Sequence, residues 1–256
     1  MIKRISIVLV ILIGVIAVYL IWERSGGRRE TYPITIVNIG KASRIELGRQ
    51  LRTIAAQDPA IIGLDFFVNP DSLGQDTVLA NVMRKFRRTI QVVTLHRFNS
   101  ELYIWDSLEV SHPKFIPGGI GFANFSVRDS VLVPAVPIQQ IWKDSLIAPF
   151  GLAIAQKLGR VKPLYSEGGF GDLEFPTDQI GNNYNRIELA DIASGNFRKI
   201  ELQGKIVLMG YLGSDEDFHY LDKKKTRRAS GVEIHAAILE QSLSKAKQQV
   251  SGSSGR

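Results

Sequence analysis

Three apolar segments alternate with two amphipathic ones between Pro33 and Leu95, and this order constrains the fold more than any other feature of the sequence. The apolar segments, at 33–40, 60–67 and 89–95, are short and bounded by Gly, Pro or polar residues, which is typical of buried strands. The segments between them carry apolar residues at helical spacing. Short strand–helix–strand connections favour parallel strands with right-handed crossovers. We therefore predict an α/β fold with a mixed, largely parallel sheet flanked by helices.

The rest of the chain is expected to complete this sheet and cover it. A fourth strong strand is predicted at 205–211, and the last helix is predicted to begin near Gly231. Proline is tolerated in a first helical turn, so a helix is predicted at 146–158 despite Pro149. The remaining predictions are helices at 45–55, 75–86, 187–193 and 197–202, a hairpin arm at 101–108, strands at 119–127 and 131–136, and a loop at 170–184.

An apolar run at the amino terminus, ISIVLVILIGVIAVYLIW at 5–22, contains no charged residue. At a rise of about 1.5 Å per residue it just spans a hydrocarbon core of about 30 Å. We favour an uncleaved membrane anchor over a signal peptide or a buried helix, because the run ends in aromatic residues and Glu23 rather than in small residues. The prediction is a cytoplasmic segment at 1–4, a transmembrane helix at 5–22 and a linker at 23–31.

The orientation of this anchor is not decided by charge. Lys3 and Arg4 precede the run, and three arginines follow it at 24–29. Short amino-terminal flanks are normally retained inside while a large following domain is translocated, so we expect the domain at 32–248 to lie outside the cytoplasm. In a bacterium this predicts a single-pass protein of the inner membrane with its soluble domain in the periplasm or on the cell exterior.

Composition and charge narrow the possible partners. The chain has no cysteine, which excludes disulfides, Cys-based metal sites and a thiol nucleophile. Its net charge of +7 is moderate. The basic cluster at 223–228 has no interleaved aromatic residue, the cluster at 84–88 has only Phe86, and neither contains a known nucleic-acid motif, so no nucleic-acid partner is predicted. We interpret them as solvated surface or as contacts with anionic lipid or glycan. The tail at 249–256 is predicted to be flexible and resembles an expression linker.

Four motifs resemble those of the CHASE2 family, the extracytoplasmic sensor domains of bacterial receptors. They are IIGLDFFV at 61–68, GFANFSVRDSVLVPAVP at 121–137, LQGKIVLMG at 202–210 and GVEIHAAILEQSL at 231–243. Over 33–243 the chain is therefore identified as a member of this family. The resemblance implies a mixed α/β sensory domain that is held outside the membrane by an amino-terminal span and is usually followed by further spans and a cytoplasmic output domain.

The sequence departs from the family pattern in three places. The first strand ends at Asn38 and Ile39 without the usual aspartate, and a basic run at 223–228 follows Asp217 where the family has a Thr-Pro. No further span or output domain follows the last helix. We therefore expect signalling through a partner, which is a membrane protein or a second copy of this chain, or through a region outside this sequence.

Asp65 ends a strongly apolar strand, where a charge is costly unless it is paired, hydrogen-bonded or exposed. Ligands of parallel sheets bind beyond the carboxyl ends of the strands, and we expect Asn38 at the end of the neighbouring strand. A structural role, as a loop cap or an arginine partner, is the alternative for Asp65. The candidate ligand-binding residues are Asn38, Asp65, Asn69, Asp215 and Asp217.

Two histidines also have alternative interpretations. His219 follows the acidic residues 215–217, and this group has donors for a hard cation or zinc, but it lacks the pattern of a calcium loop. We favour a solvated acidic loop and predict no metal site. His235, beside Glu233 in the last helix, could titrate between pH 5 and 8, although packing or hydrogen bonding at the helix start is favoured.

Enzyme signatures are missing from the sequence. It has no G-x-S-x-G elbow, H-E-x-x-H motif, P-loop or G-x-G-x-x-G motif, so neither a catalytic residue nor a cofactor is predicted. We predict a membrane-anchored, non-catalytic sensor that binds an unidentified small molecule. The alternative is a structural or docking subunit of a cell-envelope complex. A hydrolase centred on Asp65 is less favoured, and a Ser or His within hydrogen-bonding distance of Asp65 would strengthen that hypothesis.

Overall fold

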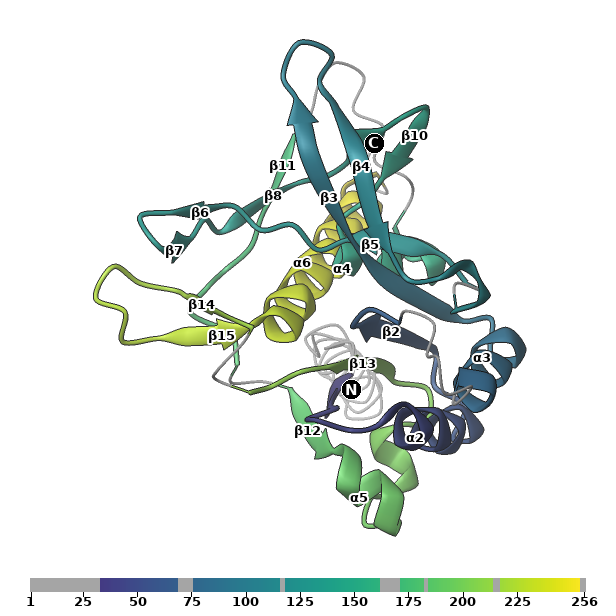
Figure 1. The fold of residues 1–256 in the computed structure, drawn as a ribbon. Helices are drawn as coiled ribbons and strands as arrows, with labels where there is room; N and C mark the ends of the chain where they lie inside the picture. Colours follow the sequence, from purple (N-terminus) through teal and green to yellow (C-terminus); the bar gives the residue numbers. More distant parts are fainter. Residues whose placement is uncertain are drawn as a thin grey trace, which may run out of the picture. The chain divides into compact units, whose positions relative to one another are not determined.

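The computed structural model describes residues 33–68, 76–115, 118–161, 171–181, 184–213 and 217–253 (Figure 1). The predicted segments at 1–4, 5–22 and 23–31 lie outside these residues, as do Asn69 and Asp215. None of the helices in the described part of the chain combines the length and the hydropathy that a bilayer span needs.

Nine strands of the described residues form the main sheet, in the order β10-β9-β4-β3-β2-β13-β1-β12, with β5 paired to β3. The neighbours β3, β2, β13, β1 and β12 are parallel. β3 pairs antiparallel with β4, and β9 pairs antiparallel with β10. This arrangement confirms the predicted α/β fold with a mixed, largely parallel sheet. The bounds are β1 (Ile34–Asn38), β2 (Ile61–Asp65), β3 (Thr89–Asn99), β4 (Ile104–Val110), β5 (Ile120–Phe122), β9 (Gln140–Trp142), β10 (Ser145–Ile147), β12 (Asn185–Glu188) and β13 (Ile206–Gly210).

Helices cover both faces of the parallel strands (Figure 1). On one face, α2 (Arg44–Ala56), α3 (Asp76–Lys85) and α5 (Leu189–Ser194) pack their apolar sides on alternate residues of β1, β2 and β13. On the other face lie α4 (Phe150–Lys157) and α6 (Gly231–Ser253). Helix α2 begins where the sequence supplies a capping box, because the side chains of Ser43 and Glu46 satisfy each other's backbone N–H groups.

Two small sheets lie beside the last helix. One contains β6 (Val127–Arg128), β7 (Val131–Leu132), β14 (Phe218–Tyr220) and β15 (Arg228–Ser230), and the other pairs β8 (Ala135–Pro137) with β11 (Asp172–Glu174). Their apolar residues pack on α6 at Ile234 and Ile238. Two 3₁₀ turns, η1 (Pro113–Phe115) and η2 (Lys199–Glu201), complete the described elements.

Five of the expected elements differ from the structure. The strand predicted at 119–127 is divided into β5 and β6, and the strand predicted at 131–136 is divided into β7 and β8. The helix predicted at 146–158 begins only at Phe150, because Pro149 occupies the N-cap position with ψ 146° and the residues before it form β10. The segment predicted as a loop at 170–184 contributes β11 to a two-stranded sheet. The helical piece predicted at 187–193 begins with two residues of β12, which adds an edge strand beside β1.

Candidate functional site

The carboxyl ends of β1, β13 and β2 are in register at Asn38, Gly210 and Asp65. Asn38 and Asp65 were expected on neighbouring strands, but β13 lies between them. That expectation is therefore wrong, because β13, from much later in the chain, inserts between the two strands. Both residues do lie at the carboxyl edge of the parallel strands, where such sheets bind ligands.

The side chain of Asn38 holds three segments together at this edge. Its Nδ2 donates a hydrogen bond to Glu188 Oε2 at 2.8 Å, across to the end of β12. Its Oδ1 accepts hydrogen bonds from the backbone N–H groups of Gly40 at 3.2 Å and Leu212 at 3.0 Å. One amide therefore fixes the turn after β1 and the segment that leaves β13.

A pocket of about 360 Å³ with a mixed polar and apolar lining opens beside Asn38. The turn after β1, the start of α2 and the junction of β12 with α5 form its walls, and polar groups come from Lys41, Glu46, Gln50 and Glu188. The pocket brings carboxylate, amide and ammonium groups to one concave surface. Such a mixed lining suits a small polar ligand with hydrogen-bond donors and acceptors.

Asp65, on the other side of β13, is packed against His235 of α6. The side chain of Asp65 is 9% exposed and that of His235 is 1% exposed. Asp65 Oδ1 lies 3.6 Å from His235 Nε2, just beyond hydrogen-bonding distance. Within the described residues, Asp65 Oδ2 and His235 Nδ1 have no hydrogen-bond partner. Two unsatisfied polar atoms in a buried site are unusual in a native fold, because each loses its hydration without replacement.

Aromatic rings surround His235. Its imidazole lies 4.7 Å from the ring of Phe125 and 4.9 Å from the ring of Phe150, measured between centroids. The ring of Phe125 also contacts His219 at 5.1 Å. The favoured interpretation of His235 as a packed residue is confirmed by these contacts and by its burial.

Burial and neighbouring charges set the protonation of this cluster. Loss of hydration, together with a smaller contribution from the carboxylate of Asp217, raises the pKa of Asp65 to about 8. Loss of hydration, with a smaller contribution from His219, lowers the pKa of His235 to about 3. Burial also lowers the pKa of His219, and Asp217 opposes that shift. The less favoured alternative for His235, titration between pH 5 and 8, does not fit this lowered pKa, because burial keeps the ring neutral.

Asp217 lies against the first residue of α6. A Cβ atom added to Gly231 would lie 2.6 Å from Asp217 Oδ2, so this carboxylate occupies the space above a glycine at the helix start. The positive end of a helix dipole favours an anion there. Glu233 also acts at this end, because its Oε2 accepts hydrogen bonds from the backbone N–H and hydroxyl of Ser230.

The structure thus places three of the five candidate residues at one edge of the sheet. Asn38 and Asp65 end parallel strands, and Asp217 is close enough to Asp65 to alter its pKa. Asn69 and Asp215 lie outside the described residues. Of the acidic loop expected at 215–217, only Asp217 lies among the described residues, where it is half-buried and directly precedes β14. Glu188 was missed because its segment was predicted to be helical.

Among the described residues, no hydroxyl group is hydrogen-bonded to the Asp65–His235 pair. His235 approaches Asp65, as a catalytic base would, but its Nδ1 has no hydrogen-bond partner and therefore activates no hydroxyl. An arginine partner for Asp65 is also absent from the described residues. The same residues contain no group of three or more His, Asp or Glu side chains able to hold a metal ion.

The fold and its strand-end polar groups are those of an α/β domain with a potential ligand site. Residues 24–254 match the model of the CHASE2 domain, so the chain belongs to the CHASE2 family. CHASE2 domains are extracytoplasmic sensor domains and are typically non-catalytic. No curated protein and no solved structure matches the chain.

Proposed function

We propose that this chain is a membrane-anchored, non-catalytic sensor whose stimulus binds at the carboxyl edge of the parallel strands. One observation carries the proposal: a pocket of about 360 Å³ with a mixed polar and apolar lining opens at Asn38, and the same side chain fixes the segment after β13. A ligand that competes for the amide of Asn38 therefore acts directly on that segment. The apolar run at 5–22 supports an anchor in a bacterial inner membrane.

The segment after β13 provides the route from the pocket to the last helix. It begins at Leu212, bonded to Asn38, and leads to Asp217, which contacts the first residue of α6. Helix α6 packs closely on α4, since a Cβ atom at Gly151 would lie 2.7 Å from His235 O. A stimulus shifts this arrangement only when it binds two conformations with different affinity. We propose that α6 transmits the change to a membrane-protein partner or to a second copy of the chain.

The direct test is a thermal-shift screen of the full chain in detergent against small metabolites, divalent cations and envelope glycans. A ligand stabilises the folded state by mass action, so a true stimulus raises the melting temperature further as its concentration increases relative to its dissociation constant. The Asn38→Ala variant is expected to lose this response. Asn99→Ala is a matched control, because Asn99 Oδ1 likewise accepts two backbone N–H groups, in the hairpin between β3 and β4. Compounds that stabilise both variants equally would argue against the strand-end site.

A docking subunit of an envelope complex is the second candidate function, and the tip of the β3–β4 hairpin favours it. This hairpin projects from the sheet (Figure 1), and its tip exposes Phe98 at 47%, Leu102 at 64% and Tyr103 at 64%. Exposed aromatic groups of this kind commonly anchor protein interfaces. An unresponsive screen, together with a partner that is retained by the full chain and lost in a Leu102→Ser/Tyr103→Ser variant, would favour docking over sensing.

A further inference from the structure

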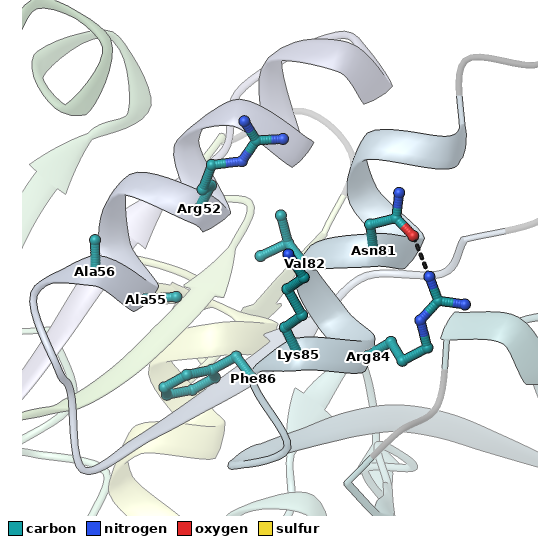
Figure 2. Close-up of a pocket in the computed structure, with 8 residues that line it drawn as sticks. All are labelled: Arg52, Ala55, Ala56, Asn81, Val82, Arg84, Lys85 and Phe86. Carbon is teal, nitrogen blue, oxygen red and sulfur yellow. Dashed lines mark hydrogen bonds between the residues drawn. The ribbon is translucent and has the colours of Figure 1, made fainter.

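A groove of about 730 Å³ lies between the last turns of α2 and α3, at the other end of α2 from the pocket beside Asn38 (Figure 2). Its lining includes apolar surface from Ala55, Ala56 and Phe86. Three cations, Arg52, Arg84 and Lys85, line the same groove. The groove therefore combines positive charge and apolar surface in one concavity.

The three cations are not neutralised by the described part of the protein. All three residues are exposed, and Arg84 bonds only to the neutral amide of Asn81 (Figure 2). No carboxylate of the described residues pairs with any of them. Arg88, just outside the groove, is different, because it pairs with Asp58 and lies 5.0 Å above the ring of Phe86. Local ion pairing thus explains Arg88 but leaves the groove cations available to an anionic ligand.

The groove lies at the amino edge of the parallel strands. The helix turns that form it lead directly into β2 at Ile61 and β3 at Thr89, and these residues share the edge with Ile34, where the chain enters the sheet. The predicted span ends at Trp22, and a chain of about ten residues reaches at most roughly 35 Å. In the anchored protein that we propose, a linker of this length limits how far the entry edge can lie from the bilayer, whereas the candidate ligand site occupies the opposite edge of the sheet.

We propose that this groove binds an anionic phospholipid of the membrane that anchors the chain. Arg52, Arg84 and Lys85 contact the phosphate, and the apolar surface at Phe86 contacts the start of the acyl region. Basic side chains at a membrane surface bind anionic headgroups electrostatically, and guanidinium groups match phosphate oxygens in geometry. An acidic protein segment would satisfy the cations but leave the apolar surface unused. The proposal goes beyond the proposed function and takes from it only the anchor.

The test uses the full chain in lipid nanodiscs with one copy per disc. Because the chain contains no cysteine, Ala56→Cys gives a unique position for an environment-sensitive dye in the groove. Emission is compared between nanodiscs of phosphatidylcholine alone and nanodiscs that contain phosphatidylglycerol. The same labelled position is then combined with Arg52→Gln/Lys85→Gln. The control pair is Lys223→Gln/Lys224→Gln, which removes the same charge from exposed lysines between β14 and β15.

We expect a blue shift of the dye emission only with phosphatidylglycerol, its loss in Arg52→Gln/Lys85→Gln, and its retention in Lys223→Gln/Lys224→Gln. No lipid-dependent shift, or an equal loss in both double variants, would overturn the proposal. A blue shift that appears in phosphatidylcholine nanodiscs only when they hold two copies of the chain would mean that the groove binds a second copy. That result would also overturn the proposal. Retention of the chain in the disc, measured by gel filtration, separately reports whether the anchor itself fails.

Discussion

Asp65 Oδ1 and His235 Nε2 face each other at 3.6 Å in a site that excludes most water, and the two residues are mainly uncharged at neutral pH. Ionising either residue would place a charge in a buried site where no hydrogen-bonded partner replaces the lost hydration, and this is costly in free energy. The protonated carboxyl and the neutral imidazole are thus the forms that suit this burial. The pair therefore makes the stability of the domain depend on pH.

The free energy of unfolding should fall as pH rises from about 6.5 to 8. The pKa of Asp65 is about 8 in the folded chain and 3.8 when unperturbed, so folding retains a proton and stability decreases with pH between these values. The pKa of His235 is about 3 in the folded chain and 6.5 when unperturbed, so its contribution increases with pH between those values. Between about pH 3.8 and 6.5 the effects of Asp65 and His235 on the free energy of unfolding therefore oppose each other. Above pH 6.5 only the decrease caused by Asp65 remains.

The Asp65→Asn variant should remove this alkaline loss. If the folded state holds one more proton than the unfolded state from pH 6.5 to 8, the free energy of unfolding falls by about 2 kcal/mol over that range. Chemical denaturation at several pH values measures this change. The control Asp106→Asn changes an exposed aspartate on β4 and should keep the wild-type profile. Parallel profiles for wild type and Asp65→Asn between pH 6.5 and 8 would show that Asp65 does not hold the proton.

In the Asp217→Asn variant, the decrease in the free energy of unfolding that Asp65 causes should end at a lower pH. The carboxylate of Asp217 is the second cause of the raised pKa of Asp65, so its removal lets Asp65 ionise more easily. It should also lower the pKa of His219 further, since Asp217 favours the charged imidazole. Carbon-detected NMR of the Asp65 carboxyl and proton NMR of His219 can follow both groups. An unchanged midpoint for Asp65 would place Asp217 too far away to interact.

Asn38→Ala should destabilise the chain and release the segment after β13. The substitution leaves the backbone N–H groups of Gly40 and Leu212 without their acceptor and leaves Glu188 without its donor. The expected loss is about 1–3 kcal/mol, with faster amide hydrogen exchange at Leu212. Asn38→Asp keeps the acceptor and should preserve slow exchange at Leu212, although it places two carboxylates together. Equal exchange in all three proteins would contradict the proposed role of Asn38.

Gly151→Ala should destabilise the domain more than Gly63→Ala. A Cβ atom at Gly151 meets backbone atoms of α6 at 2.7 Å, whereas one at Gly63 meets the side-chain ends of Ile154 and Leu208 at the same distance. Side-chain ends can move aside, but backbone cannot move without separating α4 from α6. Overpacking of the Gly63 kind costs about 1–3 kcal/mol, and denaturant unfolding of both variants gives the comparison. A smaller loss for Gly151→Ala would contradict the close helix contact.

The alternating strands and helices of the parallel sheet could be predicted because their sequence signals are local. Unbroken apolar runs and helical spacing mark β1, α2, β2, α3 and β13, and their observed bounds lie within a few residues of the predicted ones. The edge strand β12 and the short strands β14 and β15 gave no such signal. Their residues alternate only over three or four positions, and long-range pairing rather than local preference makes them strands.

The candidate site was predictable only in part for the same reason. Asp65 was recognisable because a charge ends an apolar strand, and such a charge needs an explanation wherever the strand lies. Its contact with His235 joins residues that are distant in the sequence, and the insertion of β13 between β1 and β2 decides which groups meet. Glu188 gave no comparable signal, because a carboxylate at a strand end is informative only where the strand itself can be predicted, and β12 was predicted to be helical.

The central claim is that the stimulus binds at the carboxyl edge of the parallel strands. Hydrogen exchange of the full chain, with and without a compound that raises its melting temperature, tests this most directly. We predict slower exchange at 38–42, 188–193 and 211–213, which form the pocket and the segment bonded to Asn38. Protection confined to the β3–β4 hairpin, with no change at these three segments, would contradict the claim.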